Sequence, residues 1–383
     1  MIPIAKPFLG KGEAAAASKA ILSGWVTQGP RVEQFEKDFA SYVGSRYACA
    51  VSSCTTALHI ALLAVGVKPG DAVITVSHSF IATANSIRHC GAEPIFADID
   101  PETFNISCEA LERCLTKGRK MRRVAAIMPV HQMGMPADLK SVLSIARKFN
   151  IPVVEDAACA IGSEISMTKG RTWNKIGKPH GDIACFSFHP RKVITTGEGG
   201  MLTTNNAEYD KNFRLLRQHG MSLSDRARHL AKKISVEAYV TTGYNYRMTD
   251  IQAAIGIEQL KCVKEMVARR RRLALRYKKE LSAVSWLKLP VEPEYARTNW
   301  QSYPVRVLKG APRSRNGLMQ YLLDKGIATR RGIMNAHQEL PYSRHREVLK
   351  NSESARDSVI LLPLFYELKD SEIKKIAGYI KDA

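Results

Sequence analysis

The sequence lacks the features that mark membrane proteins, secreted proteins and zinc sites. No run of about 18 apolar residues occurs, and the first residues show no basic stretch followed by an apolar block and a cleavage site. Eight cysteines are scattered without a Cys-x-x-Cys pair or interleaved histidines. We therefore expect a cytoplasmic protein with no membrane span and no metal, in which most cysteines are small buried apolar residues.

Acidic residues are few compared with basic ones. The chain has 57 Lys and Arg against 36 Asp and Glu, a formal net charge of +21. Hydrophobic residues make up 45% and charged residues 24%, which excludes wholesale disorder and low-complexity architectures. The charge excess favours an anionic partner, which is a nucleic acid, an anionic membrane surface or a phosphorylated small molecule.

Short apolar runs alternate with amphipathic stretches through the first two thirds of the 383 residues. Runs such as VAAIMPV and IPVVE are continuously apolar, as in strands buried on both faces. This pattern predicts an α/β fold with a mostly parallel sheet flanked by helices, whose ligands bind at the carboxyl ends of the strands. The expected strands are 47–52, 72–77, 94–99, 124–130, 151–155, 183–188 and 200–204, and the expected helices between them are 53–67, 80–90, 108–116 and 139–149.

Helical periodicity then continues from Thr249 to about Leu281, which predicts one long helix or a broken pair, with Thr249 or Asp250 as its N-cap. A strand at 302–307 and helices at 315–325 and 370–380 follow. We therefore expect a large α/β domain with an N-terminal segment over 1–250, a connecting helix over 251–283 and a small C-terminal α+β domain over 284–383.

The segment FSFHPRKVITTGEGG places Lys192 between the end of an expected strand and a glycine-rich turn. Alone, Lys192 would be read as a surface lysine. In VVEDAA, Asp156 comes just past a second expected strand, and its carboxylate suits a protonated pyridine nitrogen or the cap of a neighbouring helix.

Two further segments offer groups of the same kind. SSCTTAL begins a helix, where free N–H groups and the hydroxyls of Ser53 and Thr55 would suit a phosphate or form an ordinary N-cap. GYNYRMTD carries Asn245 and Arg247 directly before the long helix, where they would otherwise be loop residues.

Together these segments resemble the DegT/StrS-type nucleotide-sugar aminotransferases, which depend on pyridoxal phosphate and have the fold type I architecture. The resemblance spans nearly the whole chain, through GWVTQGPRVEQFEKDF, EDAACA, SFHPRKVITTGEGG, GYNYRMTDIQAA and RRGIMNAH. It implies pyridoxal 5'-phosphate as cofactor, pyridoxamine 5'-phosphate as its intermediate form, and a homodimer with shared active sites.

The resemblance implies a role for each matching residue near the cofactor. Lys192 would bind the cofactor covalently and later move a proton, and we expect partial desolvation to let its amine lose a proton near neutral pH. Asp156 would pair with the ring nitrogen and Phe80 would stack on the ring. The phosphate and the phenolic oxygen would lie beside Ser53, Cys54, Thr55, Ser187, Cys159 and, from the partner subunit, Asn245.

A second set of matching residues would bind the sugar substrate. Trp25, Thr27 and Gln28 would lie near the entrance of the site. Arg247 and His337 would lie where a nucleotide diphosphate binds, with Arg330 as a further candidate.

The chain departs from the usual family pattern at two cysteines. Cys54 replaces the glycine of Ser-Gly-Thr, although a residue in helical conformation still presents its N–H. Cys159 replaces the glutamine of Glu-Asp-Ala-Ala-Gln, so that a weakly donating thiol replaces the amide beside the phenolic oxygen. Lys192 itself favours amino transfer, because the family's dehydratases carry histidine at that position.

The resemblance implies transfer of an amino group from L-glutamate to a keto group of a nucleotide-linked deoxy sugar. Amination of a cyclitol or free keto sugar is the alternative within enzymes. A nucleic-acid-binding regulator with a vestigial site is a third interpretation, supported by RRRR at 269–272 and RKMRR at 119–123. Four successive helical residues fan around the axis, so we expect most of RRRR to lie on a solvated face.

Overall fold

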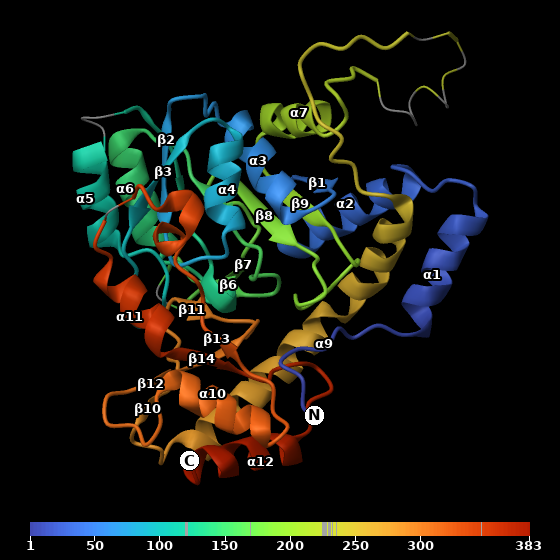
Figure 1. Cartoon of the computed structure of the whole chain (residues 1–383). Coiled ribbons are helices and arrows are strands. Elements are labelled where there is room, and N and C mark those ends of the chain that lie inside the picture. The colour runs from blue at the N-terminus through green and yellow to red at the C-terminus, as the bar shows by residue number, and fades with distance from the viewer. Residues whose placement is uncertain are drawn as a thin grey trace.

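The computed structural model describes residues 1–118, 122–168, 170–223, 228, 231, 233–234, 236–345 and 347–383. A large α/β part lies above a smaller C-terminal part in Figure 1, and one long helix connects them. Among the described residues, no helix combines the length and the apolar character needed to cross a membrane.

In the described part of the chain, the strands of the central sheet have the spatial order β3-β2-β4-β5-β8-β9-β1. Parallel bridges at Ile127–Val153 and Val130–Asp156 join its two groups of strands. Strand β9 runs antiparallel to both neighbours, and the other pairings within this sheet are parallel, so the predicted α/β fold with a mostly parallel sheet is confirmed. The strands are β1 (Tyr47–Val51), β2 (Ala72–Val76), β3 (Glu93–Ala97), β4 (Val124–Met128), β5 (Val154–Asp156), β8 (Ile183–Ser187) and β9 (Gly200–Thr204).

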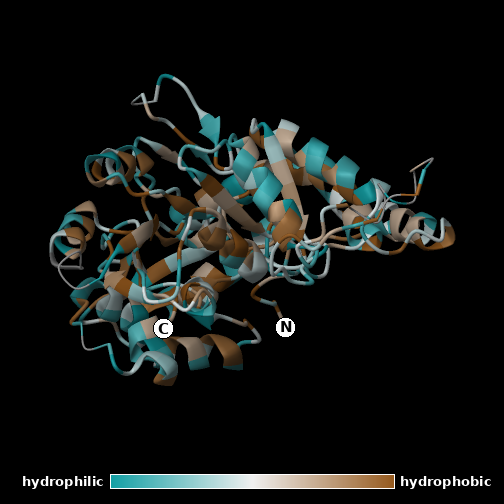
Figure 2. Ribbon diagram, turned by 90° about the horizontal axis from the view of Figure 1, so that it is seen from above, coloured by the Kyte–Doolittle hydropathy of each residue, from teal (hydrophilic) through white to brown (hydrophobic). Residues whose placement is uncertain are grey.

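Helices cover both faces of this sheet, because alternate strand residues point to opposite sides. Ile74 belongs to one buried cluster and its neighbour Val73 to another. The first cluster includes residues of α2 (Pro30–Val43), α5 (Cys108–Gly118), α6 (Leu139–Phe149) and α9 (Asp250–Leu281), and the second includes residues of α3 (Cys54–Ala64), α4 (Ala82–His89) and α7 (Ala207–Leu216). Figure 2 shows the central strands largely in hydrophobic brown, with teal residues on the helices around them.

Smaller elements complete the large part. Helix α1 packs on α9. The short strand β6 pairs with β7 on one side and, on the other, with β11 from the chain beyond α9. These elements are α1 (Lys11–Leu22), the 3-10 turn η1 (Gln132–Gly134), β6 (Glu164–Ile165), β7 (Asn174–Lys175) and β11 (Ala296–Arg297).

The C-terminal part has its own core, built from residues 273 onward and joined at its edge by Ile2. Its sheet has the order β10-β12-β14-β13. An isolated parallel bridge from Ile2 to Ile327 holds the N-terminal segment of the chain against the C-terminal part. The domain boundaries that we expected at 250 and 283 stay predictions. The elements are β10 (Leu287–Lys288), β12 (Tyr303–Val307), α10 (Arg315–Asp324), β13 (Arg330–Arg331), η2 (Ala336–Gln338), η3 (Leu340–Tyr342), α11 (Lys350–Ser358), β14 (Val359–Leu362) and α12 (Asp370–Lys381).

The connecting segment is one unbroken helix, α9, with Thr249 as its N-cap. Our expectation that most of RRRR lies on a solvated face is wrong. Arg272 is exposed, but the other three arginines turn back onto the protein. Arg269 donates to the Leu368 carbonyl at 2.7 Å, and Arg271 donates to the Thr298 carbonyl at 3.0 Å.

Arg270 is the most deeply buried of the four, with 4% of its surface exposed. Its Nη1 donates to the carbonyl oxygens of Trp300 at 3.0 Å and Leu364 at 3.2 Å. Burial lowers the pKa of Arg270 to about 10. These arginines therefore tie α9 to the C-terminal part and are not available to a polyanion. Of RKMRR, residues 119–121 lie outside the described residues, and Arg123 forms an ion pair with Asp71 at 3.0 Å.

Candidate active site

The carboxyl ends of β5 and β8 bring two of the predicted residues to one edge of the sheet. The two strands are parallel, and their register pairs Asp156 with Cys185, two residues before Ser187. Asp156 is 4% exposed, and Ser187 is buried at the end of β8. Lys192 follows in the loop between β8 and β9, so the order of the chain alone places the lysine at the same edge as the carboxylate.

Lys192 is half-buried, and its Nζ donates a hydrogen bond to Cys159 Sγ at 3.0 Å. Burial acts to lower the pKa of Lys192, but the contact with Cys159 and the charge of Asp156 outweigh burial and raise that pKa above its ordinary value. In the chain without cofactor, burial alone therefore does not set the pKa of Lys192, and our expectation for the amine beside the cofactor stays a prediction. The negative and polar partners at the sheet edge stabilise the ammonium form.

The N-terminus of α3 lies against β9 at the same edge. Ser53 is the N-cap, and its hydroxyl accepts a hydrogen bond from the Thr56 N–H at 3.2 Å, so this side chain performs the ordinary capping role. A Cβ at Gly200 would lie 2.4 Å from the Ser53 carbonyl oxygen and 2.8 Å from the Cys54 nitrogen. Glycine at position 200 is thus required for the close approach of β9 to this helix end.

Cys54 is the first residue of α3, and its side chain is buried with the Sγ 3.7 Å from the Cys185 carbonyl oxygen. Burial raises the pKa of the Cys54 thiol well above its usual range, so the side chain is neutral. Its backbone N–H belongs to the first turn, where helices offer unpaired donors. Thr55 follows, half-buried, in the same turn.

Phe80 precedes α4, and its side chain is 65% exposed. Its carbonyl oxygen accepts a hydrogen bond from the Thr83 N–H at 3.1 Å, and Thr83 in turn donates to Asp156 Oδ2 at 2.7 Å. The exposed ring and the buried carboxylate are therefore connected through one turn of chain.

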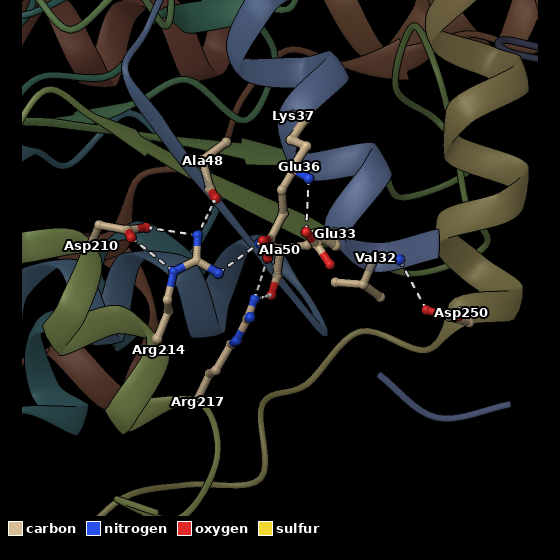
Figure 3. Close-up of polar contacts among 10 residues, drawn as sticks. All are labelled: Val32, Glu33, Glu36, Lys37, Ala48, Ala50, Asp210, Arg214, Arg217 and Asp250. Carbon is tan, nitrogen blue, oxygen red and sulfur yellow. Dashed lines mark hydrogen bonds and ion pairs between the residues drawn. The ribbon is translucent and has the colours of Figure 1, made fainter. Parts of the chain in front are cut away.

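Asp250 connects two segments that are far apart in the sequence. It does not cap its own helix; instead its carboxylate accepts a hydrogen bond from the backbone N–H of Gly29 at 2.8 Å. It also accepts one from the N–H of Val32 at 2.9 Å, at the start of α2 (Figure 3). Its own N–H donates to the Thr27 carbonyl at 3.0 Å. The carboxylate thus stabilises the positive end of α2 and joins the expected entrance segment to the chain beyond Asn245.

Within the expected entrance segment, Trp25 Nε1 donates to the Gln28 carbonyl at 3.1 Å. Asn245 is exposed and pairs with Gln218 through an isolated bridge. Arg247 forms a similar bridge with Val51, at the end of β1.

Comparison with known proteins decides the family. Residues 7–381 match the model of the DegT/DnrJ/EryC1/StrS aminotransferase family. The chain belongs to this family. The aminotransferase is 35% identical over 387 residues to the spore coat polysaccharide biosynthesis protein SpsC of Bacillus subtilis, covering 100% of this chain and 96% of SpsC.

Two solved structures show how closely the aminotransferase follows the family fold. The aminotransferase TlmJ from Streptoalloteichus hindustanus has a TM-score of 0.88 at 32% identity, over 100% of this chain and 98% of TlmJ. Spr1654 from Streptococcus pneumoniae, solved in a PLP form, has a TM-score of 0.88 at 27% identity, over 100% of this chain and 98% of Spr1654. The fold type I prediction and the dependence on pyridoxal phosphate are confirmed.

The residues at the sheet edge fit this cofactor. Asp156 is buried, yet among the described residues each of its oxygens receives one hydrogen bond, from Thr83 and from the Ala158 N–H at 3.2 Å. A carboxylate can accept about four, so capacity is left for a ring N–H. The open aromatic face of Phe80 and the free N–H groups at the start of α3 suit a ring and a phosphate. The roles of the individual residues stay predictions.

The two candidates in RRGIMNAH lie in different settings. Arg330 is exposed on β13. His337 is buried, with its Nδ1 2.6 Å from Ser77 Oγ and its Nε2 3.4 Å from a carboxylate oxygen of Glu353. His337 is therefore engaged within its own chain, and its contact with a nucleotide stays a prediction.

Sequence reasoning missed a buried charge network beneath β1. Glu36 accepts hydrogen bonds from the Ala50 N–H at 2.9 Å, from Arg214 at 2.9 Å and from Arg217 (Figure 3). Burial acts to raise the pKa of Glu36, but the two guanidinium groups outweigh it and lower that pKa. The network holds the strand that leads into Ser53. Glu36 lies in a segment that the family resemblance already included, but nothing in its spacing indicated distant arginine partners.

Proposed function

We propose that this aminotransferase moves an amino group from L-glutamate to a keto group of a nucleotide-linked deoxy sugar, for amino-sugar biosynthesis in a cell-surface polysaccharide or secondary metabolite. The observation that carries the reaction type is the position of Lys192 beside Asp156 at the carboxyl edge of the sheet. The similarity to SpsC over the whole chain supports polysaccharide biosynthesis as the setting. The net charge of +21 suits anionic substrates.

Bound pyridoxal phosphate supplies an electron sink and carries the amino group between donor and acceptor. Lys192 would hold the cofactor through its Nζ and, when released, would move a proton between the donor carbon and the cofactor. Both roles need the unprotonated amine, so the raised pKa of Lys192 predicts that cofactor capture becomes faster as the pH rises. Asp156 would hold the proton on the ring nitrogen, and the first turn of α3 would bind the phosphate.

The proposal includes a homodimer in which Asn245 reaches the phosphate of the partner subunit. Its exposure fits a residue that acts outside its own subunit. The decisive experiment mixes two inactive variants, Lys192→Ala and Asn245→Ala, under conditions that exchange subunits. One site of each mixed dimer then has both residues, so activity should reappear. Failure to regain activity, with mixed dimers shown by native mass spectrometry, would place Asn245 in its own subunit's site.

The substrate class is tested by mass spectrometry of products. A panel of nucleotide-linked keto sugars, free keto sugars and keto cyclitols is incubated with the enzyme and with L-glutamate, L-glutamine or L-aspartate. We expect a mass change of ketone to amine only with a nucleotide-linked acceptor and with glutamate. Amination of the free sugars or cyclitols at equal or greater rates would contradict the proposed acceptor.

A further inference from the structure

Hydrogen bonds link three buried side chains in the order Ser79, Thr83 and Asp156. Thr83 Oγ1 donates to Asp156 Oδ2 at 2.7 Å, and Ser79 Oγ lies 2.7 Å from Thr83 Oγ1. Ser79 is 3% exposed and Thr83 is 2% exposed. Buried polar groups of this kind are strongly directional, because water does not compete for their hydrogen bonds.

The direction of each hydrogen bond follows from the inventory of donors. An ionised carboxylate only accepts, and a hydroxyl has a single hydrogen to donate. Thr83 therefore gives its hydrogen to Asp156, and Ser79 donates to the lone pair of Thr83. With the Ala158 N–H on Oδ1, both oxygens of Asp156 are fixed, and the remaining lone pairs point in defined directions.

The same turn also carries Phe80. The Phe80 carbonyl accepts the Thr83 N–H at 3.1 Å, so the exposed ring and the hydroxyl that holds Asp156 belong to one hydrogen-bonded turn. A shift of this turn would displace both the surface expected against the face of the cofactor ring and the group expected at its nitrogen. Thr83 and Ser79 would act on the cofactor through Asp156.

We propose that Thr83, oriented by Ser79, is a positioning residue that sets the direction of the Asp156 carboxylate toward the ring nitrogen of pyridoxal phosphate. This inference rests on the proposed role of Asp156, and it is independent of which sugar or donor the enzyme uses. A hydrogen bond to a charged group is among the stronger ones, so its loss should weaken cofactor binding by about tenfold.

The test compares Thr83→Val, which keeps the shape and removes the hydroxyl, with Thr83→Ser, which keeps the hydroxyl. Two quantities are measured without any amino donor or acceptor, namely the dissociation constant of pyridoxal phosphate and the pH midpoint of the bound cofactor's visible absorbance. We expect Thr83→Val to weaken binding by about tenfold and to shift the midpoint. Thr83→Ser should stay within about twofold of the parent protein, and equal defects in the two variants would overturn the inference.

The path through Asp156 is tested by a double-mutant cycle. In an Asp156→Ala background, Thr83→Val should change neither quantity further, and an effect of undiminished size there would overturn the inference. Asp156→Ala alone should itself move the absorbance midpoint; an unmoved midpoint would refute the role of Asp156 and this inference with it.

Ser79→Ala provides a milder variant should Thr83→Val fold poorly. It should change both quantities in the same direction as Thr83→Val and by a smaller factor, and no change would contradict the relay. A negative substrate panel would leave all of these measurements unaffected, so failure of the sugar proposal and failure of this inference are distinguishable.

Discussion

The catalytic edge of the sheet and the arginine run of α9 both concentrate polar side chains, but they use them differently. At the sheet edge, Asp156 keeps lone pairs, Phe80 is exposed and Lys192 contacts a weak acceptor sulfur. In α9, Arg270 donates to main-chain carbonyls of the C-terminal part. A ligand-binding site is therefore recognised by polar groups that can still form hydrogen bonds. A dense run of charged residues is not sufficient to indicate one.

The largest expected effect is on turnover and comes from a change at the carboxyl edge of the central sheet. Lys192→Ala should lower turnover at least about a thousandfold, because it removes the amine that binds the cofactor and moves the proton. Unfolding temperature without cofactor should change little. Steady-state kinetics measure the turnover, and thermal denaturation measures the unfolding temperature. The matched control is Lys211→Ala, at an exposed lysine on α7. An active Lys192→Ala protein would contradict the assignment of the lysine.

Arg270→Met should have the opposite effect, lowering stability while cofactor binding persists. It leaves buried carbonyl oxygens without a donor, so the free energy of unfolding should fall by about 2 kcal/mol. Denaturant titration measures this, and cofactor binding by the folded variant should persist. The control is Arg272→Met on the exposed side of the same helix, which should change stability by less than about 0.5 kcal/mol. Equal effects in the two variants would remove the distinction between bonded and solvated arginines.

Gly200→Ala tests the contact between β9 and the start of α3. The added methyl would meet the Ser53 carbonyl and the Cys54 nitrogen, so the helix end must shift. We expect the dissociation constant of pyridoxal phosphate to rise by about tenfold. Gly378→Ala in α12 is the matched control, since a Cβ there meets nothing within 4 Å. Unchanged affinity in Gly200→Ala would argue against a phosphate at this helix end.

The smallest expected effect concerns Cys159. This residue raises the pKa of Lys192, so Cys159→Ala should lower that pKa and increase the fraction of neutral amine at a given pH. The pH midpoint for the rate of cofactor capture, followed by visible absorbance, should move to lower values. Cys108→Ala, at a half-buried thiol in α5, serves as the control. A midpoint that stays in place or rises would show that Cys159 does not set the amine's protonation.

Much of the large part could be predicted because buried strands and amphipathic helices leave strong local patterns. Helix α6 and strand β9 have the predicted bounds. The antiparallel direction of β9 could not be predicted, since a strand buried on both faces has the same composition in either direction. The solvation of RRRR was mispredicted because the carbonyls that Arg269 and Arg270 reach lie about 30 to 100 residues away in the chain.

In the candidate site, too, some residues could be placed from the sequence and others could not. Residues that end strands, such as Asp156 and Ser187, could be placed from the chain order alone. Side-chain relays such as Thr83 to Asp156, 73 residues apart, depend on packing between elements. The contact of Lys192 with the Cys159 sulfur, 33 residues away in the chain, depends on the same kind of packing.

The carboxylate of Asp250 has a consequence for protein engineering. Because it binds the backbone of 29–32 and is the first residue of α9, the loop at 25–29 cannot be exchanged as an independent cassette. A loop grafted from a relative to change acceptor preference must keep the N–H of residue 29 aimed at this carboxylate, next to the N–H groups of Arg31 and Val32 at the start of α2. A chimaera that changes position 250 together with the loop would lose the hydrogen bonds that hold the two segments together.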